Sequence, residues 1–589
     1  MPGEPGNLGQ FWQELKRRKV IRVIIVYAAA SFVILELVSI VAEPFGLPDW
    51  TIKLVFVILC VGLIISIILS WIYDITPEGI EKTQSVKVVS GEDKPVTSNS
   101  WKIASYISLI VIVALIILNI IPRTNLSGKR TTLEKSIAIL PFRNDSPDTA
   151  NEFFINGIME SILDNLCKIE DLRVIARTSV EQYRDKPMHV AKIAEALNVF
   201  YILEGSGQRY ENQIRLTVQL IDAVHDKHIW SRQYDKDIED VFSIQSEIAQ
   251  LIASEIRAVV TPEVKLRIEK EPTVNMEAYN LYLQGRHHFT RGGQGKESID
   301  QSIQFYQRAL DADPDFALAY SGLAASYSAY AYSGSFPRSE VMNLAKEAAR
   351  KALSIDNTLG EAHAELAWTR IYQDFNWKEG ERGLKLALEL NPNYAIAHRN
   401  YSWLLTFIGR HEESIAEAKR AMELDPLSNP FWSWLARAYS YARDYDRAIA
   451  EFQKLLRNYP DSDFERSWLS LAYLSKGMNQ EALSEISKVK DIDWVDGYIY
   501  GVTGEKEKAQ EVLEYYLERS KSEFVKPTDF TVIYTGLGEY DKALEYLEQA
   551  YETREGWLVL MQVEPLYDSL RKEPRFQEIL DKMNFPEIE

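Results

Sequence analysis

The chain has 589 residues, enough for several domains. Its 66 basic and 85 acidic side chains leave a formal net charge of −19, which argues against a nucleic-acid-binding surface, because such a surface needs concentrated positive charge. Its two cysteines, Cys60 and Cys167, lie far apart in an apolar run and a more polar segment, so the sequence predicts neither a disulfide framework nor a cysteine metal site.

Three apolar runs follow a short N-terminus of residues 1–19. Each is close to the roughly 20 residues that cross a bilayer as a helix. Aromatic residues such as Trp50 and Trp101 stand at their ends, as interfacial anchors do. The sequence therefore predicts an integral membrane protein in contact with the lipid bilayer. The predicted transmembrane helices are residues 20–42, 52–73 and 101–121.

Lysine and arginine predict the orientation of these helices. They are frequent before and just inside the first run and again in the loop between the second and third, whereas only Lys53 lies between the first and second. The positive-inside tendency then places the N-terminus in the cytoplasm, and three spans place the residues after 121 on the opposite side. Four basic residues run against this assignment: Arg123, Lys129, Arg130 and Lys135.

Glu36 lies inside the first apolar run. A charged carboxylate within a bilayer costs about 2.5–3.5 kcal/mol on insertion scales. Its side chain is therefore expected either to be protonated or near the interface through helix tilt, or to contact a polar partner. The second alternative makes Glu36 a contact between membrane helices and predicts a homo-oligomer.

Residues 136–262 have the pattern of an α/β domain after a polar linker of residues 122–135. The apolar run 136–142 predicts a strand buried on both faces, and residues 153–166 show apolar positions at helical spacing. Further along, the order is strand, helix, three strands in quick succession and a helix over about 241–260 that ends at Pro262. This order predicts a domain of ordinary size.

The sequence then repeats itself every 34 residues. Pro460 maps back to Pro426 and Pro392, and Trp434 maps forward to Trp468. Such a period indicates stacked helix–turn–helix units, each closed by a proline that cannot continue the hydrogen-bond ladder. About eight pairs are predicted over 271–552, followed by a helical cap at 553–589.

The 34-residue pattern resembles the tetratricopeptide repeat. One copy carries the signature residues at Leu435, Ala436, Tyr439, Ala448, Phe452 and Pro460. The resemblance implies an all-α superhelix with a concave face.

The α/β segment resembles the TolB amino-terminal-like (FlgO-like) domain, through SIAILPF, GIMESILDNL, LRVIARTSV, LNVFYILEGS, IRLTVQLIDA and HIWSRQYD. The N-terminal blocks FWQELKRRKVIRV, GLPDW and ITPEGIEKT resemble the membrane module of bacterial proteins with this layout. The resemblance implies a protein of the bacterial inner membrane whose residues after 121 are periplasmic, with no established chemistry. Relatives often carry a winged-helix or nucleotide-cyclase domain before the membrane module, and the nineteen residues here predict neither activity.

Two short motifs suggest chemistry that their context does not support. Residues 291–298 resemble a phosphate loop, but Thr290 and Glu297 stand where glycine and a hydroxyl residue are needed. His225 and His228 could meet a metal at a hairpin turn, but no third ligand is evident. We therefore expect no catalytic residues, no cofactor and no metal.

The concave face of the predicted repeats holds the residues favoured for binding a protein or peptide partner. Tryptophan, tyrosine and arginine are enriched in interaction hot spots, although large aromatics in repeats more often pack between helices. Counting through the repeat gives Arg399, Asn400, Trp403, Phe407, Trp434, Arg437, Tyr441 and Trp468.

Three hypotheses follow. The first is a membrane-anchored, non-enzymatic scaffold that binds a partner in the repeat groove. The second is a transmembrane sensor whose α/β domain binds a small ligand and signals to a separate cytoplasmic partner. The third, an enzyme, has no supporting motif.

The Glu36 hypothesis gives a first prediction. Glu36→Leu removes the polar contact and should weaken self-association, measured as the oligomer distribution of the full chain in membranes. Unchanged oligomerisation would leave Glu36 as an interfacial residue only.

Overall fold

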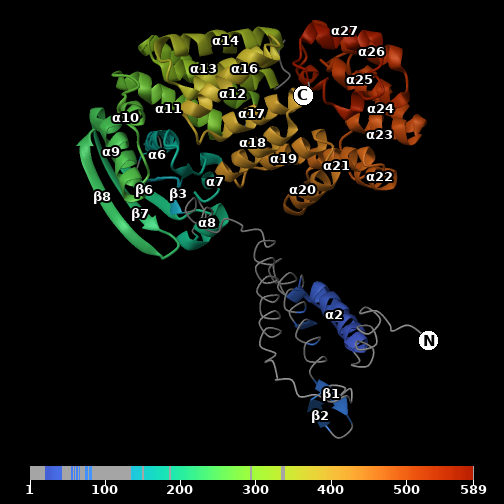
Figure 1. The fold of residues 1–589 in the computed structure, drawn as a ribbon. Coiled ribbons are helices and arrows are strands. Elements are labelled where there is room, and N and C mark those ends of the chain that lie inside the picture. The colour runs from blue at the N-terminus through green and yellow to red at the C-terminus, as the bar shows by residue number, and fades with distance from the viewer. Residues whose placement is uncertain are drawn as a thin grey trace, which may run out of the picture. The chain divides into compact units, whose positions relative to one another are not determined.

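The computed structural model describes residues 20–42, single positions between 55 and 66, and residues 73–76, 79–82, 134–146, 148, 151–184, 188–291, 295–332 and 338–587. The chain divides into two compact units, residues 1–122 and 123–589 (Figure 1).

The first unit contains a helix and a hairpin. Helix α2 (Val20–Ala42) has the bounds of the first predicted membrane helix and carries Glu36. Strands β1 (Tyr73–Thr76) and β2 (Gly79–Lys82) pair antiparallel, so Tyr73 begins a strand and does not end a helix. None of the helices in the described residues is long and apolar enough to cross a membrane. Most of predicted helix 52–73 and all of 101–121 lie outside the described residues.

The second unit begins with a mixed α/β domain, as predicted. Its six-stranded sheet has the order β5-β3-β6-β7-β8, with β4 beside β6. Strand β3 runs parallel to β5 and β6, whereas β6, β7 and β8 form an antiparallel meander. The strands are β3 (Ser136–Ile139), β4 (Arg143–Asn144), β5 (Arg173–Val174), β6 (Tyr201–Tyr210), β7 (Gln213–Asp222) and β8 (Lys227–Asp237).

Apolar side chains alternate between the two faces of the strands, so the sheet has an apolar core on each face. Ile214, Leu216, Val218 and Leu220 of β7 are buried with the apolar faces of helices α6 (Glu152–Cys167) and α9 (Val241–Glu255). On the other face, Ala138 and other strand residues pack with helix α8 (Val190–Leu197). Helix α7 (Arg177–Glu181) follows β5. Figure 1 shows the long strands β7 and β8 curving around α9.

Pro262 has a different role from the one predicted. Helix α9 ends at Glu255, and Pro262 begins a separate helix, α10 (Pro262–Glu269). The Thr261 side chain caps α10 by accepting a hydrogen bond from the Val264 backbone N–H at 3.3 Å. Proline fits the first position of a helix because its missing N–H would be unpaired there.

Eight helical hairpins follow, α11 to α26. The first four are α11 (Met276–Arg291) with α12 (Lys296–Ala312), α13 (Ala317–Tyr332) with α14 (Arg338–Ile355), α15 (Gly360–Tyr372) with α16 (Trp377–Leu390), and α17 (Ala395–Phe407) with α18 (His411–Leu424). The others are α19 (Asn429–Tyr441) with α20 (Tyr445–Asn458), α21 (Asp463–Ser475) with α22 (Asn479–Ile486), α23 (Trp494–Thr503) with α24 (Lys506–Arg519), and α25 (Pro527–Leu537) with α26 (Tyr540–Glu552). The chain then forms two short 3₁₀ helices, η3 (Gly556–Leu560) and η4 (Pro565–Tyr567), and a last helix, α27 (Pro574–Met583).

The edge of the sheet is hydrogen-bonded to the helical array. The Asn393 side chain accepts from the Val174 N–H of β5 at 3.3 Å and donates to the Ile169 carbonyl at 3.0 Å. The Ala176 N–H donates to the Leu424 carbonyl at 2.7 Å. These bonds satisfy backbone groups that an uncovered edge strand would leave unpaired.

Charged residues join the two parts at a second place. Arg286 of α11 pairs with Glu160 and Asp164, which are four residues apart on α6; its Nε atom lies 2.5 Å from Glu160 Oε2. Arg177 of α7 also pairs with Glu160, which is buried. The α/β domain therefore contacts the first hairpin of the array through a set of ion pairs.

This network gives a second prediction. Arg286→Ala removes the cation of Asp164 and one of the two cations of the buried Glu160, and should lower the free energy of unfolding by about 3 kcal/mol. Lys265→Ala is the matched control, because it breaks an exposed pair with Glu269 and should cost well under about 1 kcal/mol. Chemical denaturation of the purified chain gives both values. Equal losses for the two variants would contradict a stabilising role for the network.

Candidate interaction surface

The first helix of each middle hairpin contributes to a continuous row of aromatic rings. Trp368 of α15 lies 5.3 Å from Trp403 of α17, measured between ring centres, and Trp403 lies 4.8 Å from Trp434 of α19. Tyr441 lies 6.2 Å from Trp434 and 6.0 Å from Trp468 of α21. The repeat places these rings side by side because Trp434 and Trp468 are one period apart.

The chain covers much of this row itself. We call residues 555–567, which include η3 and η4, the C-terminal strap. Its Trp557 ring lies 6.4 Å from that of Trp468, and its Glu564 accepts a hydrogen bond from the Tyr441 hydroxyl at 3.3 Å. Leu558, Met561 and other apolar strap residues are buried against the array. The strap therefore packs against the concave side as part of the core.

The segment after the strap closes the array on itself. The Trp377 indole of α16 donates to the Met583 carbonyl at 3.0 Å, and its ring stacks on Phe585 at 4.5 Å. Arg443 pairs with Asp568 at 2.9 Å. Helix α27 consequently lies beside the third hairpin, as Figure 1 shows. The predicted helical cap at 553–589 contains helix α27 (Pro574–Met583), but its first part, the C-terminal strap, packs against the array.

Arg437 stands at the centre of the aromatic row. Its guanidinium carbon lies within 6.0 Å of five ring centres, and it is closest to Trp468, at 4.5 Å. Aromatic faces attract cations because the ring quadrupole is negative there. The other four rings are Trp403, Trp434, Phe464 and Trp557. Arg399 lies 5.4 Å from the rings of Trp403 and Phe431.

The eight residues predicted for partner binding thus lie on one surface, in two groups. Five are buried, with Trp434 only 2% and Tyr441 only 1% exposed. The other three, Arg399, Trp403 and Arg437, are half-buried. A partner can reach the buried group only if the strap moves, so binding stays a prediction for the half-buried group. The buried residues are Asn400, Phe407, Trp434, Tyr441 and Trp468.

The strap brings carboxylates into an apolar environment, which the sequence did not predict. Glu564 and Asp529 of α25 both line a small cavity of about 20 Å³. Burial raises the pKa of Glu564 to about 7, and burial likewise raises the pKa of Asp529 to about 7. Glu555 of the strap is also buried and accepts from the Thr528 hydroxyl at 2.9 Å. The apolar run WLVLM was the only sequence signal that this segment turns inward.

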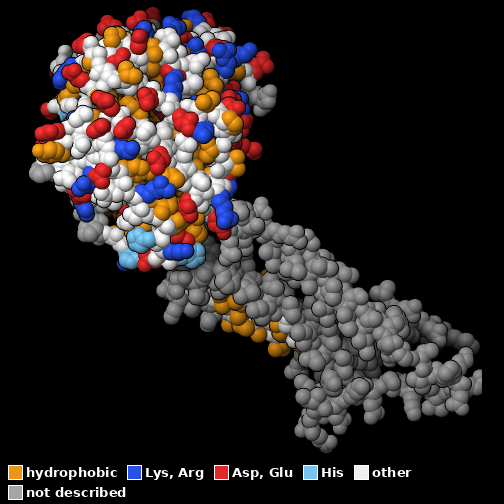
Figure 2. Space-filling view, turned by 90° about the vertical axis from the view of Figure 1, so that its left-hand side faces the viewer, with side chains coloured by type: hydrophobic (Ala, Val, Ile, Leu, Met, Phe, Trp, Pro, Cys, Tyr) orange, Lys and Arg blue, Asp and Glu red, His pale blue; other side chains and the backbone are white. Residues whose placement is uncertain are grey.

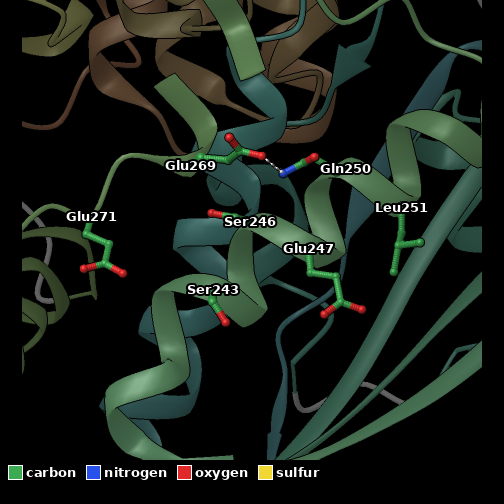
Figure 3. Close-up of a pocket in the computed structure, with 7 residues that line it drawn as sticks. All are labelled: Ser243, Ser246, Glu247, Gln250, Leu251, Glu269 and Glu271. Carbon is green, nitrogen blue, oxygen red and sulfur yellow. Dashed lines mark hydrogen bonds between the residues drawn. The ribbon is translucent and has the colours of Figure 1, made fainter. Parts of the chain in front are cut away.

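A larger depression, of about 480 Å³, lies between α9 and the α10–α11 connection. Figure 3 shows that its carboxylates do not converge: Glu247 and Glu271 lie at opposite ends, and Glu269 accepts from Gln250 at 3.1 Å. Glu247 accepts from the Tyr234 hydroxyl at 3.3 Å. Within the described residues, no group of three His, Cys, Asp or Glu side chains could hold a metal ion. The carboxylates of this depression are therefore not gathered around one point.

The remaining sequence motifs lie apart from this surface. His225, in the turn between β7 and β8, contacts Asp222 at 2.8 Å. In the segment 291–298, Arg291 ends α11 and Lys296 begins α12, so its described residues belong to the first hairpin, while residues 292–294 lie outside the described residues. Acidic and basic side chains are interspersed over the described part of the face in Figure 2, which shows no continuous basic area.

Comparison with protein families agrees with the helical architecture. Residues 433–462 and 531–556 each match a family model of the tetratricopeptide repeat. The helical array is thus a tetratricopeptide-like superhelix in which these two stretches match the family. Such arrays serve as protein-interaction scaffolds, since stacked repeats offer an extended surface. Residues 133–251 match a different family model, the second domain of HilA/YgeH-like transcriptional regulators. The predicted TolB-like assignment of this segment stays a prediction.

Curated proteins resemble this chain over part of its length. The chain is 35% identical over 189 residues to "Putative adenylate cyclase 3" of Rhizobium meliloti, which covers 32% of each chain. It is 25% identical over 184 residues to transcriptional regulator HilA of Salmonella typhimurium, 31% of this chain and 32% of that one. The chain thus spans about a third of the length of these relatives. The crystal structure of PilW, a type IV pilus biogenesis factor, is 20% identical with a TM-score of 0.31, and covers 40% of this chain and 98% of its own.

The buried strap carboxylate gives a third prediction. The pKa of Glu564 rises from an ordinary 4.5 to about 7 on folding, so its contribution is most favourable below pH 4.5 and is lost as pH rises through 7. Glu564→Gln should therefore stabilise the repeat array at pH 8, by up to about 3 kcal/mol, and should have little effect at pH 5. Thermal unfolding at the two pH values measures the difference. The exposed Glu518→Gln is the control, and a Glu564→Gln effect independent of pH would contradict the assignment.

Proposed function

We propose that this chain is a non-enzymatic scaffold, anchored in the bacterial inner membrane, whose tetratricopeptide repeats bind a protein partner. The observation that carries the proposal is the row of aromatic rings and arginines on α15, α17, α19 and α21, the first helices of the third to sixth hairpins. Tryptophan and arginine combine a large contact area with directional hydrogen bonds, which is why few such residues dominate many interfaces.

The α/β domain serves as a fixed base for this surface. Asn393 and Arg286 connect it to the array at two separate places, through hydrogen bonds and through buried ion pairs. A base held at two places keeps the first hairpins in one geometry. The partner surface is therefore preformed, which lowers the entropy lost on binding.

Membrane anchorage is supported by the three apolar runs of the sequence, each close to the length of a bilayer-spanning helix. The distribution of lysine and arginine supports a cytoplasmic N-terminus and a repeat array in the periplasm. A topology reporter fused to the C-terminus tests the periplasmic position of the repeat array directly. Signal from a reporter that works only in the cytoplasm would contradict that position.

The alternative function, a transmembrane sensor, depends on a small ligand of the α/β domain. A ligand that raised the thermal stability of the chain and altered its cytoplasmic interactions would favour this alternative. The depression beside α9 offers no converging polar groups for such a ligand, so the scaffold is the function that we favour.

A fourth prediction concerns partner capture. Phe464, at the start of α21, is 47% exposed and lies 5.8 Å from the Arg437 guanidinium carbon. A photo-crosslinking amino acid at this position should capture a defined partner in cells. The same substitution at Tyr515 of α24, 43% exposed, is the control and should capture none. The same products from both positions, or none from Phe464, would contradict binding at the concave surface.

A further inference from the structure

The C-terminal strap is attached to the repeat helices by side chains and not by its backbone. Within the described residues, all backbone hydrogen bonds of residues 556–567 stay inside residues 555–571. The chain enters the strap through Arg554, whose φ of 54° lies in the left-handed region that residues other than glycine rarely adopt. Lifting residues 556–567 therefore breaks no backbone hydrogen bond of a repeat helix.

Carboxylates make the polar contacts between the strap and the repeat helices. Glu555 accepts a hydrogen bond from the Thr528 hydroxyl of α25 at 2.9 Å, and Glu564 accepts one from the Tyr441 hydroxyl of α19 at 3.3 Å. Both carboxylates are buried, at 7% and 6% exposed. Asp529 of α25 is half-buried and lines the same cavity as Glu564. Three carboxylates thus gather where the strap meets α25.

Among the described residues, no cation forms an ion pair with Glu564. Arg437 of α19 and Arg571 interact with it electrostatically, but Arg571 pairs with Asp568 at 2.9 Å and Arg437 lies among aromatic rings. An ionised Glu564 would therefore be a buried charge without a paired cation, which is costly. The other titratable groups that face Glu564 are phenols, which stay neutral because burial raises the pKa of each: Tyr441, Tyr498 and Tyr567.

Asp529 also has no ion pair in the part of the chain that the structure describes. The groups that face it are two acids, two bases and a phenol: Glu555, Asp493, Arg519, Lys526 and Tyr516. Of the two bases, Arg519 already pairs with a glutamate at 2.9 Å and Lys526 is exposed. The two acids add negative charge beside Asp529, so its ionisation is unfavourable while the strap is closed.

Proton binding therefore favours the closed strap. Burial raises the pKa of Glu564 from 4.5 to about 7 and the pKa of Asp529 from 3.8 to about 7. Each group holds its proton more tightly in the closed state, so closing is most favourable at low pH and this advantage is lost as pH rises through 7. Between pH 6 and pH 8, each carboxylate should raise the ratio of open to closed strap by about tenfold.

We propose that the strap is a pH-sensitive latch on the concave surface, closed while the carboxylates beneath it are protonated and opened as they ionise. Opening uncovers the buried part of the aromatic row, including Tyr441 and Trp468. The consequence for partner binding, which should increase with pH, rests on the proposed scaffold function. The opening itself is a property of the chain alone.

Hydrogen–deuterium exchange of the purified full chain tests the latch, because it measures the opening of residues 556–567 separately from the rest. After correction for the pH dependence of the chemical exchange rate, opening of this segment should increase by at least about tenfold from pH 6 to pH 8. Helix α20 is the internal reference and should change little. A strap that opens equally at both pH values, or more at pH 6, would overturn the proposal.

Two variants assign the response to the carboxylates. Glu564→Gln cannot ionise, so it should lose about tenfold of the increase between pH 6 and pH 8. Asp529→Asn should do the same independently and keeps the test decisive if Glu564→Gln does not fold. Glu518→Gln, at an exposed position on α24, is the control and should keep the wild-type response. A full wild-type response in both Glu564→Gln and Asp529→Asn would overturn the proposal.

The outcomes separate the latch from the function that it would regulate. Opening that increases with pH, without any partner crosslinked at Phe464, would support the latch and count against the scaffold. A partner crosslinked at Phe464, with a strap that does not open between pH 6 and pH 8, would remove the latch and leave the scaffold function in place.

Discussion

The concave side of this helical array carries a row of aromatic rings, and the polypeptide itself covers most of that row. Helix α6 lies against the first hairpins and the C-terminal strap lies against the later ones. Both bring polar groups with them: α6 carries Glu160 and Asp164, and the strap carries Glu555 and Glu564. The two covers differ in electrostatics, because the carboxylates of α6 meet Arg286, whereas Glu564 lies in an apolar site and holds its proton more tightly.

This arrangement explains why so little of an apparently rich binding face remains accessible. The aromatic row from Trp368 to Trp468 would make an extended hot spot if it were bare, but Trp557 and its neighbours already use most of that area. What remains half-buried is narrow and carries Arg399, Trp403 and Arg437. Specificity at such a site comes from satisfying these polar groups more than from apolar contact, since a partner without matching acceptors would leave them unpaired.

The architecture could be predicted from local patterns, because a 34-residue period and strand alternation are local properties. The spacing of Pro460, Trp434 and Trp468 predicted the hairpins and their inner face. The alternation of apolar and polar residues in β7 predicted which strand face lies in the core. What could not be predicted was which distant segment covers which face. The bond from Tyr441 to Glu564 joins residues 123 positions apart, and that from Asn393 to Ile169 joins residues 224 apart. Pro262 shows the limit of prediction from local patterns, because proline can either end or begin a helix. The hydrogen bond from the Val264 N–H to the Thr261 side chain identifies Pro262 as the start of α10.

The contact between Trp377 and the end of α27 changes how the array should behave as a folding unit. In an open solenoid each repeat touches only its neighbours, so stability spreads along one dimension and the ends fray independently. Here the third hairpin is bonded to residue 583, which links early and late repeats directly. Loss of either end is therefore expected to reach the middle of the stack, so the array should melt as one cooperative body in place of unravelling repeat by repeat.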